Sequence, residues 1–235
     1  MTTHSLHVLS GGAAQGLSKT CAPTFEAAHA TQIQGTFGAV GAMKAKLLEG
    51  APCDVLILTQ ALIDALIASG QVRAGSARAI GVVTTGVAVK HGQPHPSVNT
   101  TAGLKDTLLA ATGIYFPDPK LATAGIHFMK VLQGLGIAQT VAERLRTYPN
   151  GATAMKAMAE VDDPHVVGCT QVTEILITPG VDLVADLPPE FELATVYTAA
   201  ITTACAQPEL AQAWLDTLTH PAGADTRRAA GFLPA

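Results

Sequence analysis

Short runs of β-branched and aliphatic residues alternate along the chain with longer segments rich in Ala and Leu. The short runs have the length and composition of β-strands, and the longer segments place their apolar residues at helical spacing. This alternation constrains the fold more than any other feature, because it is the pattern of an α/β architecture. It predicts eight strands, which are Leu6–Leu9, Gln32–Phe37, Val55–Leu58, Ala79–Val89, Ile114–Phe116, His165–Thr170, Val181–Ala185 and Leu193–Thr198.

Seven helices are expected between these strands. The first contains Pro23, which removes one backbone donor and predicts a bend there. The fifth is expected to turn a stripe toward the core, made of Leu121, Phe128, Leu132 and Leu135. The seven expected helices are Ala13–His29, Ala39–Glu49, Gln60–Ser69, Thr101–Ala111, Leu121–Leu135, Gly151–Val161 and Pro208–Thr219.

The long strand Ala79–Val89 contains Gly81 and Gly86, which permit a bend or a bulge near the middle of the chain. Such a strand suits a crossing between two lobes, and a second crossing is expected near Leu193–Thr198. We therefore predict two α/β lobes with a cleft between them. Lobe 1 comprises residues 1–82 plus 197–235, and lobe 2 comprises residues 83–196.

Composition excludes several classes of protein. The chain has 235 residues, of which 48% are hydrophobic, and a formal net charge of −4. A nucleic-acid-binding protein needs a basic face, so this class is excluded. No stretch approaches the ~20 unbroken apolar residues that span a bilayer, so no membrane association is expected. The low aromatic content of 4% makes a monomer the default expectation.

The N-terminus and the cysteines indicate the compartment. The residues before Leu6 contain no basic region, apolar core or cleavage site of a signal peptide, which predicts a cytoplasmic protein. A periplasmic location follows instead if a signal peptide has been removed. The four cysteines are widely separated and predict free, buried thiols rather than a disulfide framework or metal cluster: Cys21, Cys53, Cys169 and Cys205. The eight histidines show no HExxH pattern, and neither a metal nor a cofactor is expected.

Three strand-to-helix junctions consist largely of small residues. Small residues let a ligand approach backbone N–H groups, and a helix N-terminus attracts anions. The alternative is that these glycines only serve tight turns and close packing. No P-loop or GxGxxG pattern is present. The candidate binding residues at the junctions are Ser10, Gly11, Gly12, Ala13, Ala39, Val40, Gly41, Lys120, Thr123, Ala124 and Gly125.

A second candidate group follows later in the chain. Asn150 and Gly151 precede or begin a helix, and Asn150 either caps that helix or contacts a ligand. Thr170 and Gln171 end a strand, where ligands of α/β proteins usually bind. Glu174 is either a catalytic carboxylate or a surface one.

The histidine most suited to acid–base chemistry is His127, on the helix that follows the third junction. His127 acts either as a general acid or base, or as a partly buried histidine with a structural hydrogen bond. No GxSxG elbow is present, and no Ser–His–Asp triad can be assembled from the sequence.

Several segments resemble one family. The segment Gly50-Ala-Pro-Cys-Asp-Val55, the opening Leu6-His-Val-Leu-Ser-Gly-Gly-Ala13 and the stretch Val82–Gly92 resemble ModA-like molybdate-binding proteins. The stretch from Val167 to Pro189 and the tail ending in Gly231-Phe-Leu-Pro234 are similar to a subgroup that includes aconitate isomerases. The resemblance covers almost the whole chain. It implies the type 2 periplasmic-binding-protein fold, with two α/β lobes, a central cleft and two crossover strands.

The sequence departs from this family at the first two junctions. The family's molybdate sites use serine hydroxyls there, whereas this chain offers only Ser10 beside the junctions. A tetrahedral oxyanion would lose several donors. A small di- or tricarboxylate, held by backbone amides with Thr123, Asn150 and Thr170, is therefore expected as the ligand.

The resemblance implies an isomerase of the aconitate-isomerase type, which moves a proton by a 1,3-shift, and the N-terminal residues predict that it is cytoplasmic. Lys120, Thr123 and the amides of Ala124 and Gly125 are expected to hold a carboxylate. The candidate proton-transfer groups are Asp118, His127 and Glu174, and Asp118 has the alternative role of a turn residue between two prolines. The alternative function is a solute-binding component of a molybdate-type ABC importer that closes at a hinge. A third possible function is a cytoplasmic anion sensor, which binds the ligand without turnover.

Overall fold

The computed structural model describes residues 4–235, and these residues form two compact units. Unit 1 comprises the chain up to Val83 together with Thr195–Ala235, and unit 2 comprises Thr84–Ala194. The sequence placed these boundaries after residues 82 and 196. Two strands, β4 (Arg78–Lys90) and β9 (Ala194–Ile201), contain the boundaries between the units.

The sheet of unit 1 has the strand order β2-β1-β3-β9-β4. The strand β1 (His4–Gly11) runs parallel to β2 (Thr31–Gly38) on one side and to β3 (Val55–Thr59) on the other. The carboxyl ends of these three strands therefore lie at the same edge of the sheet. β9 runs antiparallel to β3 and returns the chain from unit 2.

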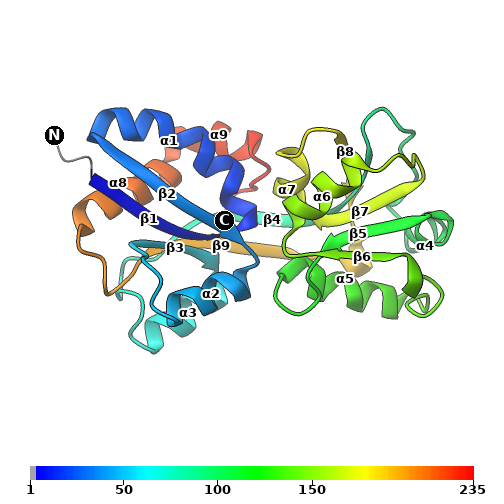
Figure 1. The fold of residues 1–235 in the computed structure, drawn as a ribbon, viewed down its shortest axis with the longest axis horizontal. Coiled ribbons are helices and arrows are strands. Elements are labelled where there is room, and N and C mark those ends of the chain that lie inside the picture. The colour runs from blue at the N-terminus through cyan, green and yellow to red at the C-terminus, as the bar shows by residue number, and fades with distance from the viewer. Residues whose placement is uncertain (1–3) are drawn as a thin grey trace. The chain divides into compact units, whose positions relative to one another are not determined.

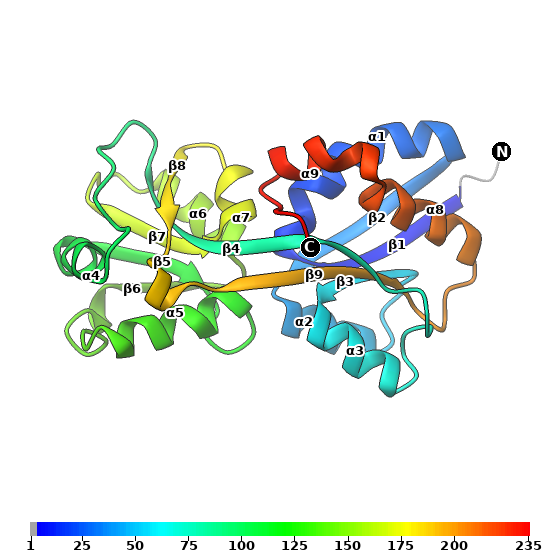
Figure 2. The ribbon, with the colours of Figure 1, turned by 180° about the vertical axis from the view of Figure 1, so that it is seen from behind.

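Helices cover both faces of the unit 1 sheet (Figures 1 and 2). One face carries α1 (Gln15–His29), α8 (Pro208–Thr219) and α9 (Ala224–Ala229), and the other carries α2 (Val40–Leu48) and α3 (Gln60–Ala68). Burial on both faces explains why the strands are apolar along their whole length, as in Val55-Leu-Ile-Leu58. The short 3₁₀ helix η1 (Gly12–Ala14) joins β1 to α1.

The sheet of unit 2 continues from β4 in the order β4-β7-β5-β6, with β8 also paired to β4. β5 runs parallel to β6 and β7, whereas β4 runs antiparallel to β7 and β8. The register between β4 and β8 shifts at Val87 and Ala88, which marks a bulge. The bounds are β5 (Gly113–Pro117), β6 (Leu145–Tyr148), β7 (Val166–Gln171) and β8 (Val181–Asp186).

Two apolar clusters lie on the two faces of the unit 2 sheet. Phe116 packs in the cluster that contains the residues of α4 and α5, and its neighbour Tyr115 packs in the cluster formed with α6 and α7. Successive strand residues point to opposite faces, so this assignment follows from the alternation of the strand. The bounds are α4 (Thr101–Ala110), α5 (Thr123–Gly134), α6 (Gly151–Glu160) and α7 (Val172–Leu176). Three further 3₁₀ helices are η2 (Ala142–Arg144), η3 (Pro189–Phe191) and η4 (Pro221–Gly223).

The predicted elements are confirmed, with differences at their ends. Each of the eight expected strands and seven expected helices is present. The sequence analysis missed three short elements, which are β6 with four residues, α7 with five and α9 with six. The predicted core stripe on α5 is wrong at Leu121, because this side chain precedes the helix and is 46% exposed. Phe128, Leu132 and Leu135 are buried as expected.

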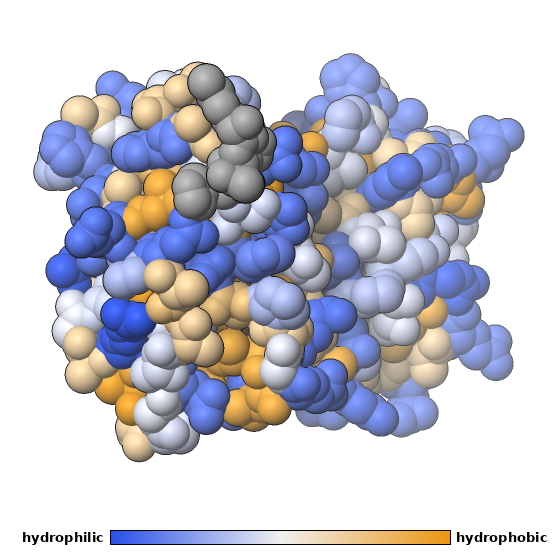
Figure 3. All heavy atoms as spheres, turned by 60° about the vertical axis from the view of Figure 1, so that its left-hand side comes forward, coloured by the Kyte–Doolittle hydropathy of each residue, from blue (hydrophilic) through white to orange (hydrophobic). Residues whose placement is uncertain are grey.

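Other sequence-level expectations concern the surface and the cysteines. No helix among residues 4–235 has the length and hydropathy needed to cross a membrane. On the face of unit 1 seen in Figure 3, hydrophobic residues lie in small groups between hydrophilic ones. The four cysteines are free thiols, three of them buried. Within the described chain, no group of three metal-ligating side chains comes together.

The packing of α5 generates a stability prediction. Replacing the fully buried Phe128 with Ala is expected to lower the free energy of unfolding by about 3–5 kcal/mol, because it leaves a cavity beside Phe116. The exposed Leu121→Ala variant is the matched control and should change it by less than about 0.5 kcal/mol. Urea denaturation followed by circular dichroism measures both. Equal losses in the two variants would contradict this packing.

Candidate functional site

In unit 1, the first two strand-to-helix junctions lie side by side. β1 and β2 are paired in register, so that Gly11 at the end of β1 lies opposite Gly38 at the end of β2. The 3₁₀ turn that leads into α1 begins at Gly12, and α2 begins at Val40. Neither Gly11 nor Ala39, the residues preceding these helical segments, makes a side-chain capping hydrogen bond in the described structure. Backbone N–H groups at two adjacent helix starts are thus without a side-chain cap, as an anion site requires.

Gly11 is the residue that brings these two junctions and a third element together. A Cβ at this position would lie 2.8 Å from Cγ1 of Val40 and 2.9 Å from Cε1 of Tyr197. Only glycine therefore permits the observed approach of α2 and β9 to the end of β1. Ser10 is buried, and its hydroxyl donates to the carbonyl of Gly11 over 2.8 Å. Ser10 thus supports the turn through its hydroxyl.

The remaining junction residues of unit 1 differ in exposure. Gly12, Ala13, Ala39 and Val40 are buried, and Gly41 is partly exposed in the first turn of α2. The sequence analysis missed Tyr197, a buried residue that β9 places opposite Thr59 at the end of β3. Its place could not be found from the sequence, because it depends on the register between strands that are far apart in the chain.

In unit 2, the third junction leads from β5 into α5. Oδ1 of Asp118 accepts hydrogen bonds from the backbone N–H groups of Lys120 at 2.7 Å and Leu121 at 2.9 Å. This confirms the alternative role of Asp118 as a turn residue. A Cβ on Gly125 would collide with the carbonyl oxygens of Pro117 and Asp118, so the glycine is required for the close approach of helix and turn.

The start of α5 resembles the starts of the unit 1 helices. Ala122 precedes the helix and provides no side-chain cap in the part of the chain described, so the N–H groups of Thr123, Ala124 and Gly125 lack one. Lys120 is exposed beside this turn. A cation and uncapped N–H groups at one helix start can hold a carboxylate.

His127 lies on α5, one turn after these residues. It is partly buried, and its Nε2 lies 2.7 Å from the carbonyl oxygen of Phe191, to which a protonated Nε2 donates. This is the hydrogen-bonded arrangement that the sequence analysis gave as the alternative to an acid–base role. The hydrogen bond to Phe191 engages Nε2 alone, so Nδ1 is the nitrogen of His127 that could still exchange a proton.

Asn150 caps α6, as one of its two predicted roles required. Its Oδ1 accepts hydrogen bonds from the backbone N–H and the hydroxyl of Thr153, each at 2.9 Å. The backbone N–H of Gly151 donates to Oε1 of Glu174 over 3.1 Å. The start of α6 is therefore already occupied by side chains of the protein.

Glu174 is a buried and hydrogen-bonded carboxyl group of unit 2. The interpretation of Glu174 as a surface carboxylate is wrong, since the residue is only 5% exposed. Its Oε2 accepts from the hydroxyl of Thr170 at 2.7 Å, and the backbone N–H groups of Gly151, Ala152 and Gln171 also donate to the carboxylate. Burial raises the pKa of Glu174, and these four donors oppose the rise.

Three buried polar side chains lie near the end of β7 without a hydrogen-bond partner among residues 4–235. They are Thr85, whose Oγ1 is unpaired, Gln171, whose Nε2 and Oε1 are both unpaired, and Thr173, whose Oγ1 is unpaired. Gln171 was a predicted ligand-binding residue, whereas the sequence analysis missed the two threonines. Buried polar groups nearly always have a partner, so these side chains are candidates for contact with a ligand or a water molecule.

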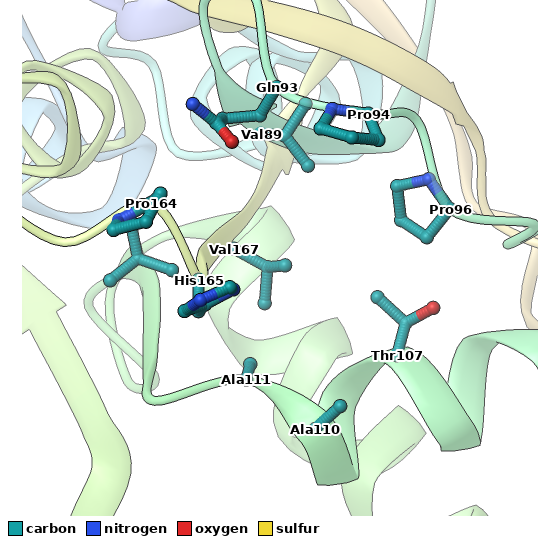
Figure 4. A pocket seen from close by; sticks show the side chains of 11 residues that line it. Val89, Gln93, Pro94, Pro96, Thr107, Ala110, Ala111, Pro164, His165 and Val167 are labelled. Atoms are coloured by element: carbon teal, nitrogen blue, oxygen red, sulfur yellow. The ribbon is translucent and has the colours of Figure 1, made fainter.

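Two pockets lie away from these residues. One, of about 330 Å³, is at the amino end of β7, where Gln93, Pro94 and Pro96 lie across from Ala111 and His165 (Figure 4). The other, of about 260 Å³, is in unit 1 and is lined by His7, Gln34, Thr36 and Lys46 among others. Neither pocket is lined by any of the predicted site residues.

The chain matches the family of bacterial extracellular solute-binding proteins over residues 6–233. Because this match spans nearly the whole sequence, the protein belongs to that family. It is also 26% identical over 239 residues to an aconitate isomerase of Pseudomonas sp., with 98% of this chain and 88% of that protein covered.

Solved structures show the same fold. The periplasmic molybdate-binding protein of Azotobacter vinelandii has a TM-score of 0.81 and 19% identity, with 98% of this chain and 99% of that chain covered. The sulfate-binding protein SubI of Mycobacterium tuberculosis H37Rv has a TM-score of 0.74 and 17% identity, with 99% and 87% covered. The fold is that of the type 2 periplasmic-binding proteins, as the resemblance to ModA-like proteins implied.

The environment of Glu174 generates a prediction about pH. Because the pKa of Glu174 is raised in the folded protein, the group favours folding at acidic pH, and this contribution is lost as pH rises through the raised pKa. The Glu174→Gln variant lacks this titration. Its free energy of unfolding, relative to that of the wild type, should therefore increase as pH rises from about 4.5 toward neutral.

Urea denaturation at a series of pH values measures this difference. Glu192→Gln, which removes an exposed carboxyl, is the control for the general loss of one negative charge. Parallel pH profiles for the wild type and Glu174→Gln would contradict a raised pKa at Glu174.

Proposed function

We propose that the protein binds a small di- or tricarboxylate and catalyses a 1,3-proton shift on an unsaturated one. The observation that carries this proposal is the set of helix starts without side-chain caps, at Gly12 and Val40 in unit 1 and at Thr123 in unit 2. Backbone N–H groups at such positions bind carboxylate oxygens without needing many basic residues. The chain has few charged residues, 14% in all, which fits this mode of binding.

The choice of a carboxylate over molybdate rests on the side chains at these helix starts. In unit 1 they are Gly, Ala and Val, and the one nearby hydroxyl, on Ser10, donates to the carbonyl of Gly11. A tetrahedral oxyanion with four acceptor oxygens would leave several of them without donors there. The similarity to an aconitate isomerase supports the carboxylate and the proton shift.

Within this proposal Asp118 is the proton-transfer group. Both oxygens of Glu174 already accept hydrogen bonds in a buried position, and Nε2 of His127 is held by Phe191. Both hydrogen bonds that Asp118 accepts go to Oδ1, so that Oδ2 has no protein donor among residues 4–235. Asp118 also stands at the start of α5, where Lys120 and Thr123 would hold the substrate carboxylate. A carboxylate so placed can remove a proton from the adjacent carbon and return it two carbons away.

The second candidate function is ligand binding without turnover, as a solute-binding component of an ABC importer. It is favoured by the match to the extracellular solute-binding family and by the similarity to molybdate- and sulfate-binding proteins. For the enzyme we propose a cytoplasmic location, because the four free cysteines suit a reducing compartment. The binding protein would instead act in the periplasm. Under both functions the protein is proposed to act as a monomer.

The first test is ligand binding and turnover by the purified protein. Small di- and tricarboxylates should raise its thermal stability, with about 2.7 kcal/mol gained at a concentration 100 times Kd, whereas molybdate and sulfate should not. Incubation with cis-aconitate should yield trans-aconitate, measured by chromatography. Stabilisation by carboxylates without turnover on any unsaturated member would support the binding protein, and stabilisation by molybdate alone would remove the carboxylate proposal.

The second test concerns the proton-transfer group. Asp118→Asn keeps Oδ1 as the acceptor for Lys120 and Leu121 but removes the base, so kcat should fall by about 10²–10⁴-fold. Carboxylate binding, followed by thermal stabilisation, should remain. His127→Gln is the matched comparison on α5 and should retain most of kcat. A fall in kcat confined to His127→Gln would assign the proton transfer to the histidine instead.

A further inference from the structure

The pocket of about 330 Å³ in unit 2 has no part in the proposed function (Figure 4). It lies at the amino end of β7, where Val166 and Val167 line it. Because β7 runs parallel to β5, the start of α5, where we propose that the substrate carboxylate binds, lies at the opposite edge of the sheet. The pocket is therefore available to a second ligand.

The two sides of this pocket are made of small, rigid side chains. Pro94 and Pro96, from the loop after β4, lie on one side, and Ala110 and Ala111, at the end of α4, lie on the other (Figure 4). A proline ring fixes its own backbone, and an alanine side chain has no rotamers to lose. We call the space between these four residues the proline–alanine slot.

The floor of the proline–alanine slot is apolar and belongs to the core of unit 2. Val89 and Val167 lie opposite each other in the antiparallel pair of β4 and β7, and both line the pocket. They are 4% and 5% exposed and pack in the apolar cluster that contains the residues of α4 and α5. The floor is therefore fixed by the core.

The loop that carries the two prolines is held near both of its ends. Asp182 on β8 accepts hydrogen bonds from Nδ1 of His91 and from the backbone N–H of Gly92, each at 2.9 Å. Val98, near the other end of the loop, is buried in the same apolar cluster as the floor. The slot is thus formed before a ligand binds, so that binding orders little of the chain.

The lining of the proline–alanine slot does not suit an ion. Among residues 4–235, no Lys, Arg, Asp or Glu side chain lines the pocket. Asp163, which precedes the lining segment, is engaged, since it accepts hydrogen bonds from the backbone N–H of His165 and the hydroxyl of Thr112. A carboxylate in the slot would be desolvated without a counter-charge. The ligand of the slot is therefore of a different class from that of the proposed function.

Polar side chains stand at one end of the slot. Gln93 and His165 lie there, whereas Pro96 and Thr107 lie at the other end (Figure 4). Neither the amide of Gln93 nor the ring of His165 makes a hydrogen bond within the described part of the chain. An amide oxygen and an imidazole nitrogen both accept hydrogen bonds. One donor on a ligand can therefore be satisfied at this end.

We propose that the proline–alanine slot binds a small, uncharged aromatic molecule that carries one N–H or O–H donor. The ring lies between the prolines and the alanines, and the donor points to Gln93 or His165. A cavity of about 150 Å³ can hold benzene, so the volume here suits a molecule of two fused rings, such as indole.

The physical reason for a ring is the rigidity of the walls. A planar ring contacts both walls with its two faces and has no rotatable bond to lose. A flexible alkyl chain of the same size loses conformational freedom in a slot that does not adapt to it. The single donor then fixes the orientation of the ring, as the few polar groups of an apolar pocket usually do.

The test is isothermal titration calorimetry with indole as the probe. The wild type should bind indole with a Kd of about 10⁻⁴ M. 1-Methylindole, which lacks the N–H donor, should bind about fivefold more weakly. 1-Heptanol, a flexible donor, should bind about tenfold more weakly than indole. A saturating concentration of cis-aconitate should leave the Kd of indole unchanged, because the two sites lie at opposite edges of the sheet.

Variants locate the binding. Ala110→Trp fills the slot and should abolish the binding of indole. Ala102→Trp is the matched control, because Ala102 is also exposed on α4 but does not line the pocket. It should bind indole like the wild type, and thermal unfolding of both variants checks that they are folded. Gln93→Leu or His165→Leu, whichever removes the acceptor, should make indole and 1-methylindole bind equally.

The outcomes bear on this site alone. No binding of indole by the wild type, unchanged binding in Ala110→Trp, or 1-heptanol bound as tightly as indole would overturn the aromatic site. A preference for indole over 1-methylindole that persists in both Gln93→Leu and His165→Leu would overturn the role of the donor. A protein that binds indole but does not convert cis-aconitate retains this site and loses only the proposed isomerase activity.

Discussion

The buried carboxylate of Glu174 is the interaction that holds the starts of α6 and α7 together in unit 2. It accepts hydrogen bonds from the start of α6, from Gln171 and from Thr170, and thereby ties the end of β7 to two helices. These donors offset part of the cost of burying this carboxylate, although burial still raises its pKa. The start of α6 is occupied in this way, whereas the start of α5 has no side-chain cap among the described residues.

In unit 1, too, backbone N–H groups take the place of basic side chains. The register between β1 and β2 places two helix starts together, and Gly11 allows Val40 and Tyr197 to approach them. Positive potential then comes from the backbone and needs no lysine or arginine. A protein with 14% charged residues and a net charge of −4 can therefore bind an anion, whereas the same composition excludes a polyanion such as nucleic acid.

The long elements and the small-residue junctions were predictable from sequence because their signals are local. Periodicity identified the strands and helices. Gly11 and Gly125 marked the two junctions at which neighbouring elements come too close for a Cβ atom. The short β6 and α7 carry too few residues for a period to be recognised. Tyr197 and Thr85 acquire their places through antiparallel pairing with β3 and β7, and that register is not encoded in neighbouring residues.

A fold that binds a small anion needs only one more group to become an enzyme for a proton shift. Carboxylates held at helix starts acidify the carbon beside them, because the developing negative charge is shared with oxygens that already accept N–H donors. In the proposed function Asp118 is this group, since its Oδ1 shapes the turn before α5 and its Oδ2 accepts no hydrogen bond within residues 4–235. Under the proposed function, one side chain would both shape the turn and supply the base. For this reason the difference between a binding protein and an isomerase of this fold can rest on a single carboxylate oxygen.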